Sequence, residues 1–252
     1  MTQYLYGKQP VRLRLDKQEP IHHLYLLSSS NWPDFLKLAQ QQDIPVTFLN
    51  KAQLDKLAPG NHQGIVAQIP SYQTVSLEDL LTSVSKDKAG LLLMADGLTD
   101  PHNLGAILRT ADATNVDGII IGKHRSVSLN ATVAKVAAGA IETVKVAAVT
   151  NLTQAINQCK AAGYWVFGTD VNQSLDYRLV DYTGPTLLVV GSEGKGLSRL
   201  VREACDQAVH IPMHGQVPSL NVSVATAVLL YEVNNQRLPI EHNRRNSKGG
   251  KP

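Results

Sequence analysis

Short apolar runs alternate with amphipathic stretches throughout residues 90–237. Runs rich in Leu, Ile and Val have the length of buried β-strands. The predicted strands span residues 91–97, 118–122, 143–149, 164–169, 186–191 and 208–213. Between them, apolar residues recur with the period of a helix, which predicts helices over 103–115, 129–140, 152–163, 197–207 and 219–236. Apolar strands separated by helices predict an α/β fold with a mainly parallel sheet covered on both faces.

The start of the chain shows a shorter alternation of the same kind. Its predicted strands are 23–27, 45–49 and 64–69, with a helix over 32–42. We therefore expect residues 1–70 to form a small α/β domain. Residues 71–89 are then a linker, in which Ser76 caps a short helix over 77–84.

Positive charge is concentrated at the end of the chain. The net charge is +3 over 252 residues. From Arg237 onward, five basic residues oppose one glutamate, which gives that segment +4 and leaves −1 on the rest. We expect residues 238–252 to be a disordered basic tail, which either contacts a polyanion such as RNA or only aids solubility.

The composition excludes several broad classes of protein. No apolar stretch approaches the roughly 20 residues that span a bilayer. The first residues lack the apolar core and cleavage site of a secretory signal. Cys159 and Cys205 fit reduced thiols better than a disulfide framework. We therefore expect a soluble, cytoplasmic protein that does not associate with membranes.

The first loop with chemical potential is DGLTDPHNLGAILRTADA, residues 96–113. Asn103 lies near the start of the predicted helix, and Arg109 follows six residues later. On a helix these two residues are about 240° apart, so they do not share a face. An arginine among small apolar residues needs an anionic or hydrogen-bonding partner if it is buried. An ordinary surface arginine is the equally open alternative.

The second loop is GSEGKG, residues 191–196. A triphosphate-binding loop requires G-x-x-x-x-G-K-[ST], and here the glycine spacing differs and Gly196 follows Lys195. Glu193 would also stand where phosphates have to lie. We therefore reject a triphosphate site and predict a flexible turn whose main chain a ligand can approach closely.

The third loop is IPMHGQVPSLNVSV, which leads into the last predicted helix. Ser219 or Asn221 can cap that helix, and this structural role is a simpler explanation of either residue than catalysis. A fourth strand ends in FGTD, with Thr169 and Asp170 as its last residues.

Other chemistries lack the motifs that they require. His210 and His214 do not form a helical metal pair, because Pro212 lies between them in a strand-to-loop sequence. The sequence has neither the nucleophile elbow G-x-S-x-G nor a dinucleotide-binding G-x-G-x-x-G after the first strand.

Together the loops resemble the signature motifs of the SpoU-type RNA ribose 2′-O-methyltransferases of the SPOUT, or TrmH, superfamily. DPHNLGAILRTADA, GSEGKGLS and IPMHGQVPSLNVSVATAVLLYE occur in the family's order, and LNATVAKVAAGAIETV between them also matches. The resemblance covers residues 91–237. The N-terminal unit, with YGKQPV and NHQGIVA, resembles the ribosomal-protein-like substrate-binding domain of the bacterial 23S rRNA (guanosine-2′-O-)-methyltransferases.

The resemblance implies a catalytic domain over 90–237 that contains a trefoil knot and binds S-adenosylmethionine. It also implies a homodimer packed near this cofactor, an RNA substrate and no metal. By motif, the cofactor-binding residues are Thr169, Gly191, Ser192, Ile211, Met213 and Leu220. The polar active-site positions fall on Asn103, Arg109, Glu193, Ser219 and Asn221.

The implied reaction is 2′-O-methylation of a ribose in 23S rRNA, at a guanosine. Arg109 is expected to hold the substrate phosphate and to stabilise the forming alkoxide, because a guanidinium is too weak a base to remove the proton. A tRNA ribose methyltransferase and a non-catalytic RNA-binding protein of the same fold are the alternatives. The modified nucleotide, and whether the substrate is naked RNA or an assembly intermediate, do not follow from the sequence.

Overall fold

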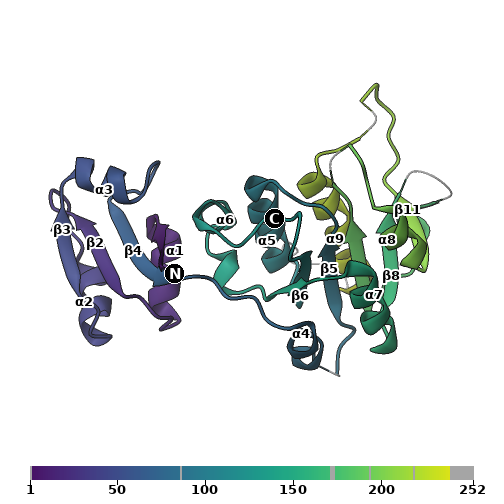
Figure 1. The fold of residues 1–252 in the computed structure, drawn as a ribbon, viewed down its shortest axis with the longest axis horizontal. Helices are drawn as coiled ribbons and strands as arrows, with labels where there is room; N and C mark the ends of the chain where they lie inside the picture. The colour runs from purple at the N-terminus through teal and green to yellow at the C-terminus, as the bar shows by residue number, and fades with distance from the viewer. Residues whose placement is uncertain (1, 86, 171–173, 193, 218, 239–252) are drawn as a thin grey trace, which may run out of the picture.

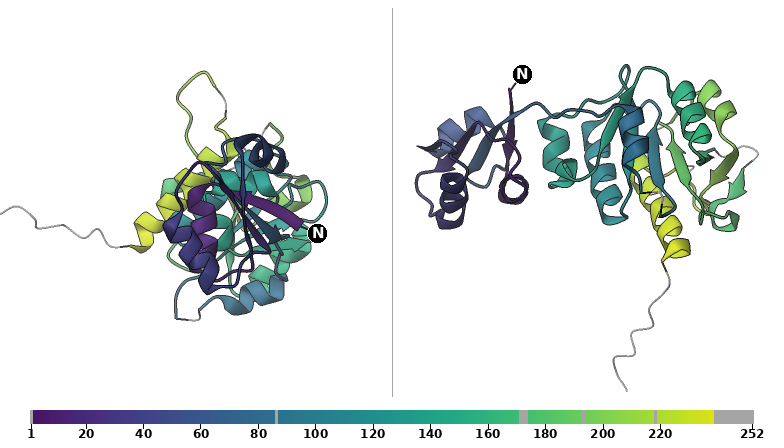
Figure 2. Two further views of the ribbon diagram at one scale, coloured as in Figure 1. Left: turned by 90° about the vertical axis from the view of Figure 1, so that its left-hand side faces the viewer. Right: turned by 90° about the horizontal axis from the view of Figure 1, so that it is seen from below.

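The chain builds two separate sheets, and a connecting segment joins them along the length of the molecule (Figure 1). The computed structural model describes residues 2–85, 87–170, 174–192, 194–217 and 219–238. Figure 2 shows the two sheet-containing units side by side along the long axis. The predicted basic tail, residues 238–252, lies outside the described residues except for Leu238.

The N-terminal unit is a four-stranded mixed sheet with helices. Its elements are β1 (Thr2–Tyr6), α1 (Lys8–Asp16), β2 (His23–Leu27), α2 (Pro33–Gln41), β3 (Val46–Leu49), α3 (Lys51–Leu57) and β4 (Ile65–Pro70). The strand order is β1-β4-β2-β3, in which only the β2–β3 pair is parallel. The predicted small α/β architecture is thus present.

Three of these elements are missing from the sequence prediction. The helix α1 contains Pro10, which reads as a helix breaker. Pro10 is tolerated because it lies in the first turn, where a backbone N–H has no partner inside the helix. The strand β1 is short and pairs with β4, more than sixty residues away, so local pattern gives little signal for it. The helix α3 depends on a capping box between Asn50 and Gln53.

The C-terminal unit contains a parallel sheet, as predicted. Its strands are β5 (Leu91–Ala95), β6 (Gly118–Gly122), β7 (Val146–Val149), β8 (Trp165–Thr169), β9 (Leu175–Asp176), β10 (Thr186–Val190) and β11 (Gln207–His210). In the described residues they pair in the order β7-β6-β5-β10-β8-β11-β9, always in parallel. The prediction ran the last strand to residue 213, but residues 211–213 are loop.

Helices cover both faces of this sheet. They are α4 (Leu77–Ser83), α5 (Pro101–Ala113), α6 (Ala131–Ala137), α7 (Leu152–Ala161), α8 (Arg199–Ala204) and α9 (Val222–Arg237), with short 3₁₀ turns at η1 (Ala140–Glu142) and η2 (Tyr177–Leu179). Alternate residues of β5 divide between two cores: Leu91 and Leu93 pack with α5 and α9, whereas Leu92 and Met94 pack with α4, α7 and α8.

The segment between the units is packed on the second sheet. Ser76 caps α4 through its side chain, as predicted, and accepts a hydrogen bond from Asp79 N at 3.0 Å. Val75 forms a parallel bridge with Ala147 of β7. Most of the predicted linker is therefore a structured part of the second unit.

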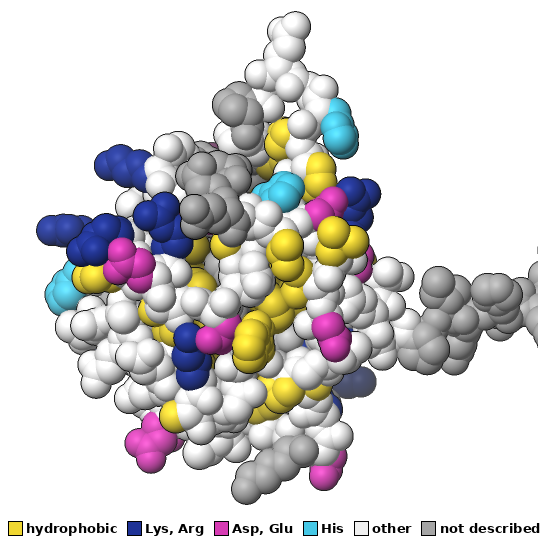
Figure 3. Space-filling view, turned by 90° about the vertical axis from the view of Figure 1, so that its right-hand side faces the viewer, with side chains coloured by type: hydrophobic (Ala, Val, Ile, Leu, Met, Phe, Trp, Pro, Cys, Tyr) yellow, Lys and Arg dark blue, Asp and Glu magenta, His cyan; other side chains and the backbone are white. Residues whose placement is uncertain are grey.

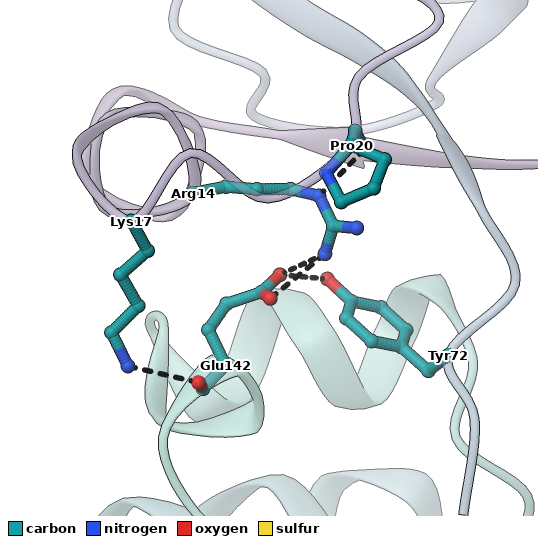
Figure 4. Close-up of polar contacts among 5 residues, drawn as sticks. All are labelled: Arg14, Lys17, Pro20, Tyr72 and Glu142. Carbon is teal, nitrogen blue, oxygen red and sulfur yellow. Dashed lines mark hydrogen bonds and ion pairs between the residues drawn. The ribbon is translucent and has the colours of Figure 1, made fainter.

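A buried polar cluster connects the two units (Figure 4). The Arg14 guanidinium on α1 donates two hydrogen bonds to the Glu142 carboxylate, at 2.7 and 2.8 Å, and both side chains are almost fully buried. The Tyr72 hydroxyl donates to the same carboxylate at 2.8 Å, and Lys17 Nζ donates to the Glu142 carbonyl at 2.9 Å. The apolar core continues through this junction, so the two units share a packed interface.

Arg237 belongs to the fold and not to a solvated tail. It ends α9, and its guanidinium donates to the carbonyl oxygens of Ala89 at 2.8 Å and Tyr182 at 2.8 Å. It also donates to Gly184 O at 2.6 Å and to Thr186 Oγ1 at 3.0 Å. This arginine ties the C-terminal helix to the segments that lead into β5 and β10.

No helix in the described parts of the chain is long and apolar enough to cross a membrane.

Candidate active site

The candidate site lies where three neighbouring parallel strands end. The strands β10, β8 and β11 are adjacent in the sheet, and their carboxyl ends lead into the GSEGKG, FGTD and IPMHG loops. Ligands of open parallel sheets bind at such an edge. A cavity of about 500 Å³ opens there. Its lining includes all six residues predicted to bind the cofactor: Thr169, Gly191, Ser192, Ile211, Met213 and Leu220.

The GSEGKG loop folds back on itself beside this cavity. Ser192 and Gly196 exchange two backbone hydrogen bonds, at 3.0 and 3.2 Å. Gly196 has φ +64°, a conformation that favours glycine. A Cβ on Gly191 would lie 2.5 Å from Leu197 N and closer still to the carbonyl group of Gly196. The turn therefore presents main chain to the cavity, and Gly191 has no room for a side chain.

A neighbouring loop holds this turn in place. The Asp96 carboxylate, just after β5, accepts a hydrogen bond from Ser198 N at 2.7 Å. Gly97 lies against Ser192, because a Cβ added to this glycine would be 3.5 Å from the Cβ of Ser192. The segment 96–100 thus packs directly against the cavity wall.

Polar groups also line the cavity at positions to which the sequence analysis gave no role in the site. Asp170 follows β8, and its carboxylate lies 3.2 Å from the guanidinium of Arg202 on α8. His210 ends β11, and its Nδ1 is 3.0 Å from Ser174 Oγ. The position of Asp170 and His210 at the ends of adjacent strands is the signal that could have found them. No local pattern marks Arg202, because its partner is 32 residues away.

Apolar side chains also line the cavity. Met213 and Leu220 are partly exposed at 38% and 36%, whereas Leu197 is buried. Figure 3 shows that apolar side chains are also exposed on the end of the molecule that carries β11 and α8. Leu200, on α8, is exposed. A cavity with a glycine-rich turn, an ion pair and an apolar wall suits a ligand that has both charged and apolar parts.

Two predicted polar residues meet beside the cavity. Asn221 caps α9, because its side chain accepts from Ser223 N at 2.9 Å, and its Nδ2 donates to Asn103 Oδ1 at 2.9 Å. This contact joins the first and third motif loops across 118 residues of sequence. Ser219 lines the cavity, and the cap of the helix is Asn221. Glu193 lies outside the described residues.

Arg109 does not join the others in the same chain. It is exposed on α5, whereas Asn103 is buried on the other side of that helix. Arg109 is absent from the cavity lining, and its side chain forms no hydrogen bond or ion pair with the described residues. The 240° separation expected from the sequence accounts for this arrangement.

Neither cysteine offers a nucleophile to the site. Cys159 and Cys205 are free thiols, and burial raises the pKa of each to about 12, so both stay protonated at neutral pH. In the described residues no group of three or more His, Cys, Asp or Glu side chains could hold a metal ion.

Comparison with known proteins identifies the family. Residues 90–231 match the model of the SpoU rRNA Methylase family, and residues 4–75 match a model described as RNA 2′-O ribose methyltransferase substrate binding. The chain belongs to the SpoU methylase family. It is thus an RNA methyltransferase whose N-terminal unit is a SpoU substrate-binding domain, and its methyl donor is S-adenosylmethionine.

A curated relative and a solved structure match over nearly the whole chain, and a second solved structure matches about two thirds of it. A protein of Bacillus subtilis named as a TrmH family tRNA/rRNA methyltransferase is 42% identical over 94% of this chain and 97% of its own. An AdoMet-bound rRNA methyltransferase of Sinorhizobium meliloti is 26% identical, with a TM-score of 0.82 over 94% of this chain and 88% of that one. The TrmH/SpoU tRNA-modifying enzyme of A. aeolicus is 35% identical, with a TM-score of 0.55 over 64% and 81%.

The residues of the SpoU methylase cavity fit S-adenosylmethionine. The turn at Gly191 leaves main-chain groups open to a ligand, and the Asp170–Arg202 ion pair places both signs of charge at the cavity, which suits a ligand with cationic and anionic groups. Ile211, Met213 and Leu220 supply an apolar wall for an adenosine ring. The cavity size also lies within the usual range for small-molecule sites.

Proposed function

We propose that this protein methylates the ribose 2′-hydroxyl of a guanosine in 23S rRNA, in the cytoplasm. The methyl-donor cavity, the substrate-binding domain and the Asn103–Asn221 contact beside the cavity support this reading. In this proposal residues 1–70 recognise RNA, 71–89 connect the units and 90–237 carry the chemistry. The trefoil knot stays a prediction from the family resemblance.

The extent of the structural matches favours rRNA over tRNA. The rRNA methyltransferase of S. meliloti aligns with both units of this chain, whereas the tRNA-modifying enzyme of A. aeolicus covers 64% of it. A separate substrate domain is therefore a feature shared with the rRNA enzyme. A tRNA substrate remains the alternative, because the B. subtilis relative carries the name tRNA/rRNA methyltransferase.

The chemistry asks the protein to orient a hydroxyl and to stabilise charge. S-adenosylmethionine supplies a methyl group on a positively charged sulfur, which makes the methyl carbon electrophilic. We assign Asn103 and Asn221 to holding the ribose at the cavity mouth, since they are joined at 2.9 Å beside its lining. Thr169, Ser192 and the main chain at Gly191 hold the donor, and Ser219 supports the loops. Glu193 is assigned to the same supporting role from the family resemblance alone. In the transfer the ribose oxygen would bond to the methyl carbon, the carbon–sulfur bond would break to leave a neutral thioether, and the hydroxyl proton would leave to solvent.

Arg109 requires a second copy of the chain in this proposal. A guanidinium can hold the substrate phosphate and stabilise the forming alkoxide, but Arg109 is exposed and away from the cavity of its own chain. One side of α9 lines the cavity through Val222 and Ala225, and the other exposes Val224 and Tyr231, at 49% and 57%. An exposed apolar stripe this close to the site suits a homodimer interface.

The test uses purified protein with labelled S-adenosylmethionine and two RNAs, a 23S rRNA transcript and total tRNA. We expect label in the rRNA, recovered after nuclease digestion as 2′-O-methylguanosine by mass spectrometry. Label on a base would overturn the ribose assignment. Label in tRNA alone would overturn the rRNA assignment.

A further inference from the structure

The loop that follows β6 carries a short run of basic side chains. Lys123, His124 and Arg125 are all exposed. Because β6 is parallel to β5 and β10, this loop lies at the same edge of the sheet as the candidate site. None of the motif assignments above uses it.

These side chains have no hydrogen-bond or ion-pair partner among the described residues, in contrast to four other cations of the same unit. Lys123, His124 and Arg125 form no side-chain hydrogen bond or ion pair there. The neighbouring ion pairs show the contrast: Lys88–Asp117, Lys160–Asp206, Arg199–Glu203 and Arg202–Asp170. The carboxylates of the adjoining loop are also engaged, because Asp96 accepts from Ser198 N and Asp100 from His102 N.

The backbone of this loop is held in a fixed shape. Lys123 N donates to Val149 O and Val127 N donates to Leu98 O, both at 2.8 Å. Arg125 has φ +55°, an uncommon conformation for a residue with a side chain. Unusual backbone conformations that the surroundings hold in place gather at functional sites. The loop thus presents its cations from a fixed frame.

Contacts place the loop between the substrate-binding domain and the methyl-donor cavity. On one side, Val127 N donates a hydrogen bond to the carbonyl of Leu98. Gly97, the residue before Leu98, packs against Ser192 of the cavity. On the other side Gln3 Nε2, on β1, donates to Leu129 O at 3.1 Å. An RNA strand that contacts both units at the carboxyl ends of these β-strands would therefore pass close to the loop.

We propose that Lys123, His124 and Arg125 form the surface along which the substrate RNA passes from the N-terminal unit to the methyl-donor cavity. Lys123 and Arg125 bind backbone phosphates, and His124 contacts the strand between them. Phosphate contacts position a nucleic acid without reading its sequence. The loop therefore sets the register of the target ribose, and recognition of the RNA remains with residues 1–70. This inference rests on the proposed function.

The test compares two double variants of the full-length protein with equal loss of charge. Lys123→Gln/Arg125→Gln removes the proposed contacts and keeps long side chains on the same backbone. Lys145→Gln/Lys160→Gln removes two lysines near the amino ends of the strands of the same sheet, where Lys145 precedes β7 and Lys160 lies in the last turn of α7. Thermal melting checks that both variants are folded, because Lys160 also pairs with Asp206. Affinity for a labelled 23S rRNA fragment is measured by fluorescence anisotropy between 50 and 300 mM salt, on the order of the range over which phosphate contacts weaken.

We expect the loop variant to bind RNA about tenfold more weakly, with a salt slope reduced by about 0.7 for each lost contact with single-stranded RNA. S-Adenosylmethionine affinity, measured by calorimetry, should not change in either variant. Equal RNA affinity of the two variants would overturn the proposal. A wild-type protein that methylates no RNA would instead overturn the proposed function itself.

A second measurement does not depend on any variant. Wild-type protein is acetylated with a lysine reagent in the presence and absence of the RNA fragment, and peptides are quantified by mass spectrometry. The RNA should protect Lys123 and leave Lys145 reactive, since both are exposed in the free protein. Equal acetylation of Lys123 with and without RNA would contradict the assignment.

Discussion

Two single residues have contrasting positions relative to the candidate cavity. Gly191 lets the main chain of the GSEGKG turn approach the ligand, because any side chain there would meet the backbone of Gly196 and Leu197. Arg109 is the opposite case, since it is exposed and lies outside the cavity of its own chain. A substitution at the first should affect donor binding, and one at the second should affect the chemical step.

Gly191→Ala should weaken S-adenosylmethionine binding by at least about tenfold, because the Cβ displaces the turn that forms the cavity wall. Calorimetric titration measures this directly. Gly215→Ala is the matched control, since a Cβ there meets no atom within 4 Å. Equal affinities of the two variants would show that the turn can adjust without cost.

Arg109→Ala should leave S-adenosylmethionine affinity unchanged and lower the single-turnover rate of methylation by about a hundredfold. The reason is that the guanidinium contacts substrate in the proposal, whereas the cavity lining lacks it. Quenched-flow measurement with saturating donor separates the two effects. An unchanged single-turnover rate would remove Arg109 from the mechanism.

Among the elements, the helix starts determine how the motif loops meet. The helices α5 and α9 begin side by side, and Asn221 both caps α9 and donates to Asn103 on α5. One asparagine thus contributes to stability and to the placement of the site, and the two contributions can be separated by substitution.

Asn221→Ala should lower the melting temperature by about 2–4 °C through loss of the helix cap, and should also lower turnover. Asn221→Asp keeps an oxygen that can cap the helix but has no N–H to donate to Asn103. We therefore expect the aspartate variant to match wild-type stability in thermal melting and still to lose turnover. Full activity of Asn221→Asp would show that the reaction does not depend on donation from Asn221 to Asn103.

Local pattern predicts the main helices and strands of the C-terminal unit, but not the two-residue strand β9, and it misses elements that depend on distant contacts. The fully buried β5 and β10 are evident from their apolar runs. In contrast, β1 exists through pairing with β4, and α1 is hidden by Pro10. The motifs place Thr169, Gly191 and Leu220 at one edge, but only the fold shows that Arg202 joins that cavity and that Arg109 does not.

For the whole molecule, the interface between the two units is the feature that the sequence does not indicate. Arg14 and Glu142 are 128 residues apart, and nothing in either segment marks them as partners. The apolar core passes through the same junction, so the units are fixed relative to each other. Removal of residues 1–70 would leave the Glu142 carboxylate without its arginine, and we expect that truncation to destabilise the remaining unit as well as to abolish RNA methylation.

Glu142→Gln should lower the free energy of unfolding by about 3 kcal/mol, because it leaves the buried Arg14 charge without a counter-charge. Chemical denaturation gives the value. Asp16→Asn is the control on the same helix, since its ion pair with Arg12 is half-exposed and should contribute less than about 1 kcal/mol. Similar losses of unfolding free energy in the two variants would show that the interface between the units does not depend on the Arg14–Glu142 ion pair.

The hydrogen bonds of the Arg237 guanidinium have a consequence for how the chain folds during synthesis. This side chain binds the carbonyl of Ala89, just before the first strand of the second sheet, across 148 positions of sequence. During synthesis the ribosome adds residues from one end, so β5 emerges long before the arginine that completes its starting edge. The catalytic unit therefore reaches its final form only after α9 has left the exit tunnel, and until then its central strands depend on neighbours that are still being made.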